Sequence, residues 1–218
     1  MLQILDLAGV FVFAATGALS ASRKKLDIIA FSFLACLTGI GGGTFRDLVL
    51  DAPVFWIQKP NYILVCLSSS VIVFFTAHLF ESRYRVLLWL DAIGMAAYCV
   101  MGAEKGLSMN AGPIGAIVMG VLTATFGGIL RDIIAQEPSV LLRREVYVSA
   151  ALSGSICFVG AHYAGLPFII SSTIGVTIAF IIRGGAIQFG WSLPSYKARI
   201  GKTEEEMERA GILPPVNK

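Results

Sequence analysis

Residues 38–47 read Thr-Gly-Ile-Gly-Gly-Gly-Thr-Phe-Arg-Asp, and residues 123–132 read Thr-Ala-Thr-Phe-Gly-Gly-Ile-Leu-Arg-Asp. The two stretches belong to a longer duplication, because residues 5–77 correspond to residues 90–162 at a constant offset of 85 positions without a gap. The chain is therefore an internal repeat. The correspondence holds at chemically unusual positions: Asp6 and Asp91, Gly9 and Gly94, Gly17 and Gly102, Gly42 and Gly127, Gly43 and Gly128, Arg46 and Arg131, Asp47 and Asp132, and Pro53 and Pro138.

The composition indicates a membrane protein. Hydrophobic residues make up 56% of the chain, charged residues only 14%, and the mean hydropathy is +0.77, whereas soluble domains have about 25% charged residues. A helix of about 20 apolar residues spans a bilayer, and barrel strands would instead show alternating segments of about ten residues. We predict an all-α integral membrane protein with seven transmembrane helices, at residues 5–22, 28–50, 62–80, 86–103, 111–130, 146–164 and 166–182.

Each copy of the repeat contains three apolar segments. Because three is odd, the second copy crosses the membrane in the opposite sense to the first, which makes an inverted repeat. We expect a first three-helix repeat at residues 1–85, a second, inverted repeat at residues 86–164, a seventh helix at residues 165–191 and a cytoplasmic tail at residues 192–218. Inverted repeats place a solute path between the two copies, so transport is the expected class of function.

The distribution of Lys and Arg predicts the orientation, because cytoplasmic loops carry the excess of positive charge. The N-terminus is predicted outside and the C-terminus in the cytoplasm of a bacterial or archaeal plasma membrane, and we expect no cleavable signal peptide. The loops expected outside hold only Lys59 and Lys105 as basic residues. The basic residues expected inside are Arg23, Lys24, Lys25, Arg83, Arg85, Arg143, Arg144, Arg183, Lys197, Arg199, Lys202 and Arg209.

The glycines of the two opening stretches predict a break or kink in the second and fifth helices. Each glycine costs about 1 kcal/mol relative to alanine in a helix interior, and glycines gather at Gly41–Gly43 and at Gly127 and Gly128. Backbone freed by a break must be buried in protein or line a water-filled cavity, so two matched breaks indicate a permeation site whose unwound carbonyls coordinate a cation. The adjoining hydroxyls of the candidate pore belong to Thr38, Thr44 and Thr123.

The alternative for these glycines is close helix packing, which small residues commonly allow between membrane helices. We favour packing for Gly9, Gly17, Gly94 and Gly102, and a functional kink for the triple glycine.

The charged residues near the apolar segments form two equivalent sets: Asp6, Arg46 and Asp47, and Asp91, Arg131 and Asp132. Ionisable groups in a membrane are costly and are usually paired or functional. We expect one Asp–Arg pair in each repeat, between Asp6 and Arg46 and between Asp91 and Arg131. Such pairs either lock neighbouring helices together or line the solute path, and the two roles are compatible.

Several other functions are excluded by the sequence. The net charge of +3 gathers in the predicted cytoplasmic loops and forms no basic stripe, so we expect no nucleic-acid partner. The chain lacks a His-Glu-x-x-His zinc motif and a Gly-x-Ser-x-Gly nucleophile turn, so we expect no enzyme activity. The cysteines, all within apolar segments, show neither metal-site nor disulfide-framework spacing; they are Cys36, Cys66, Cys99 and Cys157.

The paired glycine-Arg-Asp motifs, the repeat of three segments and the added seventh segment together resemble the prokaryotic trimeric intracellular cation (TRIC) channel family, also described as a glycine-transporter domain family. The resemblance covers about residues 3–190. It implies a homotrimer embedded in lipid, in which each protomer has its own hourglass pore lined by kinked helices 2 and 5. It also implies permeation of potassium and, less selectively, of sodium, with no cofactor. The kinks map to Gly41–Gly43 and to Gly127 and Gly128.

Two functions therefore remain open at the level of sequence. One is a monovalent cation channel, in which backbone carbonyls and Thr or Ser hydroxyls replace part of an ion's hydration shell. The other is a secondary transporter of glycine or a similar small zwitterion, in which Asp6 or Asp91 would face the ammonium group.

Overall fold

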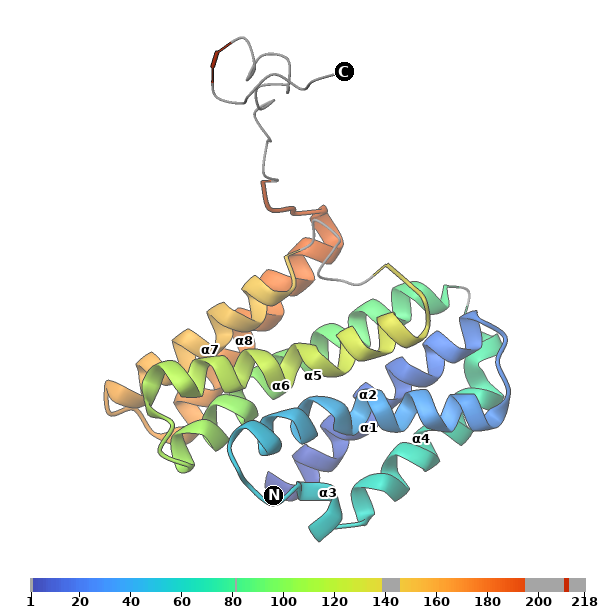
Figure 1. Ribbon diagram of the computed structural model, residues 1–218, viewed down its shortest axis with the longest axis horizontal. Helices are drawn as coiled ribbons and strands as arrows, with labels where there is room; N and C mark the ends of the chain where they lie inside the picture. Colours follow the sequence, from blue (N-terminus) through green and yellow to red (C-terminus); the bar gives the residue numbers. More distant parts are fainter. Residues whose placement is uncertain (1, 81, 139–145, 195–209, 212–218) are drawn as a thin grey trace.

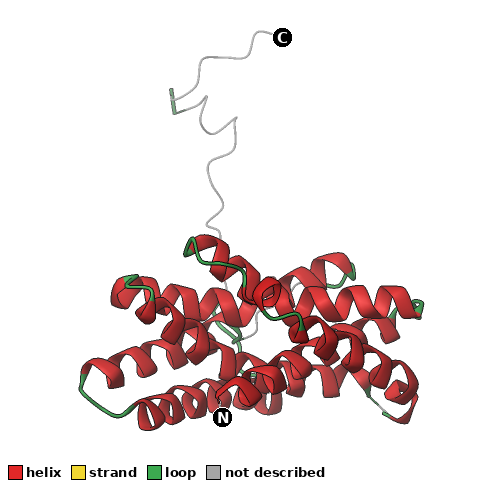
Figure 2. Ribbon diagram, turned by 90° about the horizontal axis from the view of Figure 1, so that it is seen from below, coloured by secondary structure: helices red, strands yellow, loops and turns green. Residues whose placement is uncertain are grey.

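The computed structural model describes residues 2–80, 82–138, 146–194 and 210–211, and within these it is built of helices and connecting loops, without a β-strand (Figure 2). Seven α-helices of 16 to 26 residues lie in this part of the chain. They are α1 (Leu2–Arg23), α2 (Ile28–Val49), α4 (Asn61–Thr76), α5 (Arg83–Ser108), α6 (Gly112–Ile134), α7 (Val148–Tyr163) and α8 (Phe168–Phe189), with the short α3 (Phe55–Gln58) and the 3-10 turn η1 (Ala77–Leu79) beside them.

The long helices lie where the apolar segments were predicted. Five are long and apolar enough to cross a membrane: α2, α4 together with η1 as Asn61–Leu79, α5, α6 and α8. The apolar α7 is shorter, at 16 residues, and the 22-residue α1 occupies the first predicted segment. The all-helical membrane fold is confirmed, and the count of seven spans stays a prediction.

Helix ends show why the chain turns where it does. Asp27 caps α2 by accepting a hydrogen bond from the Ala30 N–H at 2.8 Å, and Gly190 ends α8 with a left-handed backbone, φ 68°. The turns after helices also repeat at the offset of 85: φ is 56° at Lys25 and 57° at Asn110, and it is 50° at both Asp51 and Gln136. The duplication in sequence is therefore a duplication in backbone conformation.

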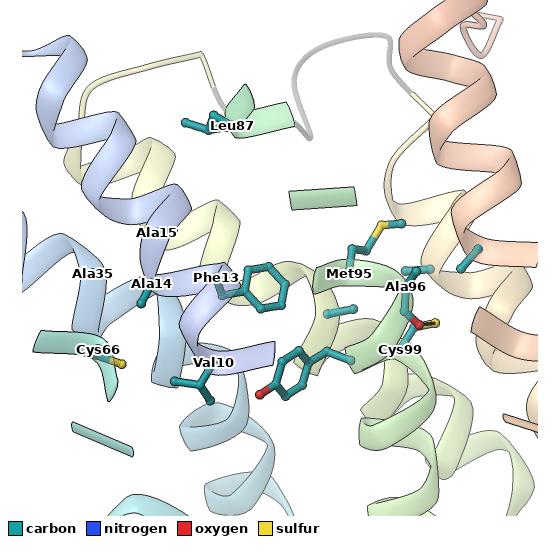
Figure 3. Close-up of a cluster of buried hydrophobic side chains, with 14 of the residues drawn as sticks. Val10, Phe13, Ala14, Ala15, Ala35, Cys66, Leu87, Met95, Ala96 and Cys99 are labelled. Carbon is teal, nitrogen blue, oxygen red and sulfur yellow. Dashed lines mark hydrogen bonds between the residues drawn. The ribbon is translucent and has the colours of Figure 1, made fainter. Parts of the chain in front are cut away.

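The two repeats pack through their first two helices. α1 contacts α2, α4 and α5, while α5 contacts α6, α7 and α8, and α2 contacts α6. As a result α4 and α8 lie on opposite sides of the bundle, with α1, α2, α5 and α6 between them (Figure 1). The core between the repeats is apolar, and Figure 3 shows Val10 and Phe13 of α1 with Met95 and Cys99 of α5 in it.

Glycines allow equivalent close contacts in the two repeats. A Cβ on Gly17 would overlap the Leu34 backbone and lie 2.6 Å from Thr38 Oγ1. A Cβ on Gly102, its counterpart, would lie 2.6 Å from the Met119 carbonyl oxygen and 2.5 Å from Thr123 Oγ1. Such small residues let helix backbones approach each other, so the packing role expected for these glycines fits the structure.

The two ends of the bundle gather different loops. At one end, which we call the α3 end, the start of α1 lies beside α3 and α4, and Asp6 accepts a hydrogen bond from Tyr62. At the other, which we call the Arg23 end, Arg23 pairs with Glu137 at 2.7 Å and Arg83 donates to the Ser22 carbonyl at 3.3 Å. The described residues of three loops that were predicted inside, those after α1, α4 and α6, therefore meet at one end, as an inverted repeat requires.

The expected unwound segments are absent from the described helices. α2 and α6 run as uninterrupted α-helices through Gly41–Gly43 and through Gly127 and Gly128. An α-helix satisfies its own backbone hydrogen bonds, which matters most where no water is available, and the glycines remain inside it because their missing side chains make room for neighbours. The prediction of unwound carbonyls is wrong, whereas a bend of the helix axis stays a prediction.

Candidate functional site

A cavity of about 580 Å³ enters the bundle from the α3 end. It reaches the surface at the exposed Gln58 and Lys59 and extends to Thr38 and Thr123 in the middle of α2 and α6. Its walls come from α1, α2, α5 and α6, with α3, the start of α4 and the start of α8 at its mouth. The lining residues are Asp6, Phe13, Thr38, Gly39, Gly42, Gly43, Arg46, Asp47, Pro53, Phe55, Gln58, Lys59, Tyr62, Tyr98, Met101, Glu104, Lys105, Thr123, Gly127 and Phe168.

The inner end of the cavity is the crossing of α2 and α6. A Cβ on Gly42 would overlap the carbonyl oxygen of Thr123, and a Cβ on Gly127 would overlap the carbonyl oxygen of Thr38. The two contacts are equivalent at the offset of 85, so the crossing lies on the symmetry axis of the repeats. The Thr38 hydroxyl donates to the Leu34 carbonyl at 2.7 Å and the Thr123 hydroxyl to the Met119 carbonyl at 2.6 Å. Both hydroxyl oxygens keep lone pairs for a further donor or a cation.

The remaining predicted glycines also pack against neighbours. A Cβ on Gly41 would lie 3.3 Å from Leu130 Cδ1, and one on Gly43 would lie 2.6 Å from the Phe55 ring. A Cβ on Gly128 would lie 2.9 Å from the Tyr147 hydroxyl oxygen. Close packing therefore accounts for all five glycines in this structure, and only Gly42, Gly43 and Gly127 also line the cavity.

The acidic residue of the first repeat is bound by tyrosines. Tyr62 donates a hydrogen bond to Asp6 Oδ2, and the Tyr98 hydroxyl lies 3.1 Å from Asp6 Oδ1 and 3.0 Å from the Asp6 carbonyl oxygen. The Tyr62 side chain is buried and holds Asp6. All three residues line the cavity.

The arginine of the first repeat turns to its neighbour in sequence. Arg46 Nε and Nη2 lie 2.9 and 2.7 Å from Asp47 Oδ1, and the guanidinium lies 5.9 Å from the centre of the Phe55 ring. Asp47 Oδ2 in turn accepts the Phe55 N–H at 3.0 Å, at the start of α3. Thr44 lies on the far side of α2 from the cavity lining, where it accepts a hydrogen bond from Trp56 Nε1 at 2.8 Å.

The second repeat brings the same residue types together differently. Arg131 Nη1 lies 2.8 Å from Asp91 Oδ1 and donates to Thr16 Oγ1 at 2.9 Å. Arg131 also pairs with Asp132, with Nη2 at 3.0 Å from Oδ1. Arg131 and Asp91 are each 1% exposed, so this cluster is closed to solvent and does not line the cavity.

The predicted Asp–Arg pairs are thus correct in one repeat and wrong in the other. Asp91 pairs with Arg131, but Asp6 does not pair with Arg46. The reason is local competition: two tyrosine hydroxyls satisfy Asp6, and the adjacent Asp47 satisfies Arg46.

The sequence interpretation missed one buried charge. Arg183 was assigned to the cytoplasmic loop after the seventh segment, but α8 continues to Phe189 and Arg183 is fully buried within it. Its guanidinium lies 5.0 Å from the centre of the Tyr147 ring. The apolar residues that follow Arg183 were the available signal that the helix continues.

Comparisons with known proteins give consistent matches. The family model described as "Glycine transporter" matches residues 3–78 and again residues 88–163. The chain is 36% identical over 198 residues to the UPF0126 inner membrane protein YadS of Escherichia coli (strain K12), covering 88% of this chain and 94% of that protein. It is 39% identical over 201 residues to a UPF0126 membrane protein of Vibrio cholerae, covering 90% of this chain and 83% of that protein.

Solved structures also match. The TRIC trimeric intracellular cation channel orthologue from Rhodobacter sphaeroides is 50% identical to this chain, with a TM-score of 0.84 over 86% of this chain and 97% of that one. A second solved structure, reported as "Structural basis for conductance through TRIC cation channels", is 29% identical to this chain. Its TM-score is 0.81 over 91% of this chain and 98% of that one.

Proposed function

Because the chain belongs to the trimeric intracellular cation (TRIC) channel family, which the glycine-transporter family model also describes, we propose that it is a channel for monovalent cations and passes potassium. It is a multi-pass membrane protein and not an enzyme. The observation that carries the proposal is the cavity of about 580 Å³, which runs from the surface to the crossing of α2 and α6.

The outer half of the proposed path is the cavity itself. Three carboxylates line it, from Asp6, Asp47 and Glu104, and Asp6 is bound only by neutral hydroxyls. A carboxylate whose charge is not cancelled by a neighbouring base raises the local concentration of cations. Arg46, Lys59 and Lys105 line the same cavity, so its formal charges balance, and Asp6 is the local group that we propose attracts a cation before the narrow part of the path.

The narrow part is the crossing of α2 and α6. Carbonyl and hydroxyl oxygens of Thr38 and Thr123 are the polar groups present there, and oxygen ligands of this kind replace part of the hydration shell of a permeating ion. Gly42 and Gly127 carry no side chain at the contact, so α2 and α6 can slide past each other without interlocking side chains. We propose that this movement, with a bend at the glycines, opens the path.

The path continues in the second repeat beside Asp91, Arg131 and Asp132, which are buried in this structure. We propose that this ion-paired cluster closes the path at the Arg23 end. The assembly is proposed to be a homotrimer in the plasma membrane, with one path in each protomer, the α3 end outside and the C-terminus in the cytoplasm. The trimer is supported by the name of the Rhodobacter sphaeroides orthologue.

Recording from purified protein in planar bilayers tests the channel. We expect unitary current steps in potassium chloride. The paired substitution Thr38→Val and Thr123→Val removes both hydroxyls at the crossing with little change of shape, and we expect the unitary conductance to fall about tenfold, the effect of about 1.4 kcal/mol on the barrier.

The matched control is Thr173→Val. Thr173 bonds its own helix in the same way, with its hydroxyl 2.8 Å from the Ile169 carbonyl oxygen, but it is exposed on α8. Its substitution should leave the conductance unchanged. An absence of current steps from protein that performs saturable uptake of glycine would contradict the channel and support the second candidate, a carrier for small zwitterions, which the presence of both Asp6 and Arg46 in one cavity favours.

A further inference from the structure

The two repeats contain the same acid–tyrosine pair. Asp6 and Tyr62 are hydrogen-bonded in the first repeat, and Asp91 and Tyr147 stand at the positions 85 residues later. In the second repeat, Tyr147 Oη and Asp91 Oδ1 lie 2.9 and 3.3 Å from the same point, where a Cβ on Gly128 would stand. The carboxylate and the phenol are therefore neighbours in both copies.

The third member of the cluster differs between the copies. In the second repeat, the Arg131 guanidinium bridges Asp132 and Asp91, at 3.0 and 2.8 Å. In the first repeat, Arg46 keeps the contact with Asp47 but not the one with Asp6, and Asp6 borders the cavity instead. Both clusters have two carboxylates and one guanidinium, but in the first the guanidinium contacts Asp47 and not Asp6, and the cavity adjoins Asp6.

We propose that Asp6, Tyr62 and Tyr98 form a binding site for an organic cation with N–H donors, a guanidinium or primary ammonium group, in the cavity at the α3 end. The second repeat serves as the internal precedent, since there a guanidinium occupies the carboxylate of the equivalent pair. The test of this site does not depend on the proposed channel activity. Binding is measured on protein in detergent, where no ion current is recorded.

The shape and chemistry of the cavity fit such a ligand. Its volume of about 580 Å³ lies within the range of about 300–1,000 Å³ that is usual for small-molecule sites. Asp6 Oδ1 and Oδ2 each receive one hydrogen bond from a tyrosine, and each carboxylate oxygen has room for a second. Aromatic faces attract organic cations, and five rings line the walls: Phe13, Phe55, Tyr62, Tyr98 and Phe168.

Other charges in the cavity set the selectivity. Lys59, Lys105 and Arg46 oppose a cation, while Asp47 and Glu104 favour it. Arg46 already pairs with Asp47 at 2.7 Å, and Glu104 and Lys105 are adjacent in α5, where residues i and i+1 do not face each other. Asp6 is held by two neutral tyrosine hydroxyls, and it is the carboxylate that we assign to the ligand.

Thermal unfolding of the full-length protein in detergent, with methylguanidinium chloride as the probe and potassium chloride at equal ionic strength as the reference, tests the site. A ligand that binds the folded state raises the melting temperature, and the rise grows with the logarithm of the ratio of ligand concentration to Kd. We expect millimolar methylguanidinium to raise the melting temperature above that in potassium chloride. The affinity should fall about tenfold or more in Asp6→Asn, because one charge-assisted contact is lost.

The matched control is Asp51→Asn, an exposed acid after α2 that does not line the cavity and whose positive φ asparagine tolerates. It should bind methylguanidinium like the unmodified protein. Equal shifts with methylguanidinium and potassium, or an undiminished shift in Asp6→Asn, would overturn the proposal.

A second measurement needs no variant. Methylguanidinium should protect Asp6 of the unmodified protein from carbodiimide-driven amide formation, read by mass spectrometry, whereas potassium should not. Equal modification of Asp6 in the two salts would overturn the proposal.

Discussion

The equivalent arginines of the two repeats, Arg46 and Arg131, make different ion pairs because their surroundings differ. Arg131 is 1% exposed and holds Asp91 and Asp132 together. Arg46 is 9% exposed, borders the cavity and, among the described residues, has its ion pair with Asp47. A buried charge without its partner is far more costly than one that reaches water, so the duplication provides a matched pair of sites for measuring this difference.

The first prediction compares Arg131→Gln with Arg46→Gln. Arg131→Gln leaves Asp91 and Asp132 buried without their shared cation, and we expect the free energy of unfolding to fall by about 3–5 kcal/mol. Arg46→Gln should cost clearly less, because it leaves one carboxylate without its cation instead of two, and that carboxylate, Asp47, keeps the Phe55 N–H. Unfolding in mild detergent, followed by tryptophan fluorescence, measures both. Equal losses of unfolding free energy in the two variants would contradict this prediction. They would show that Asp91 and Asp132 need Arg131 no more than Asp47 needs Arg46.

At the scale of helices, the crossing of α2 and α6 explains the glycines better than helix breaking does. Gly42 and Gly127 each face a backbone carbonyl of the other helix, and a backbone atom, unlike a flexible side chain, cannot move aside alone. The helices keep their internal hydrogen bonds and gain close contact. The glycine cost of about 1 kcal/mol each is therefore offset by packing, which the sequence pattern by itself does not distinguish from bending.

The second prediction concerns the paired substitution Gly42→Ala and Gly127→Ala. Each new Cβ would overlap a carbonyl oxygen of the opposite helix, so α2 and α6 must separate, and overpacking of this kind costs about 1–3 kcal/mol. We expect a lower melting temperature and a reduced potassium flux through reconstituted protein.

The control for this pair is Gly160→Ala in α7, where a Cβ would meet nothing within 4 Å. It should leave flux unchanged and raise stability by up to about 1 kcal/mol, as alanine favours a helix over glycine. Normal stability and flux in the Gly42 and Gly127 double variant would mean that the contact between these helices is not required.

The sequence predicted the helices well and their contacts in part. Hydropathy and segment length located the long helices, because burial in lipid requires continuous apolar character. The seventh helix expected at residues 165–191 contains α8, but its apolar segment was ended at residue 182, since a buried arginine within an apolar helix, Arg183, resembles the start of a basic loop. The partners of Asp6 were not predictable, because Tyr98 lies 92 positions away in sequence and its counterpart in the first repeat is Phe13.

At the scale of the whole molecule, the duplication relates two halves with opposite surroundings. Phe13 and Tyr98 are equivalent positions, and their rings lie 5.3 Å apart at the junction of the repeats. Away from that junction the halves diverge: the first repeat borders the cavity at the α3 end, and the second is filled by Arg131 and Asp91 at the Arg23 end. The cavity is therefore open at the α3 end, and the equivalent region of the second repeat is filled by side chains in this structure.

The last prediction tests whether the two repeats cross the membrane in opposite senses. Lys24 and Met109 are equivalent positions after α1 and α5, and both are exposed. In a variant whose four native cysteines are replaced by alanine, Lys24→Cys should react with a membrane-impermeant maleimide only from the cytoplasmic side, because Arg23, Lys24 and Lys25 hold that loop inside. Met109→Cys should react only from the outer side, together with Gln58→Cys at the mouth of the cavity.

Labelling of Lys24→Cys and Met109→Cys from the same side would contradict the inversion, since equivalent residues of an inverted repeat with three helices in each copy must lie on opposite faces. Labelling of all three positions from the sides opposite to those predicted would keep the inversion and reverse the orientation, which would direct the cavity at the α3 end toward the cytoplasm.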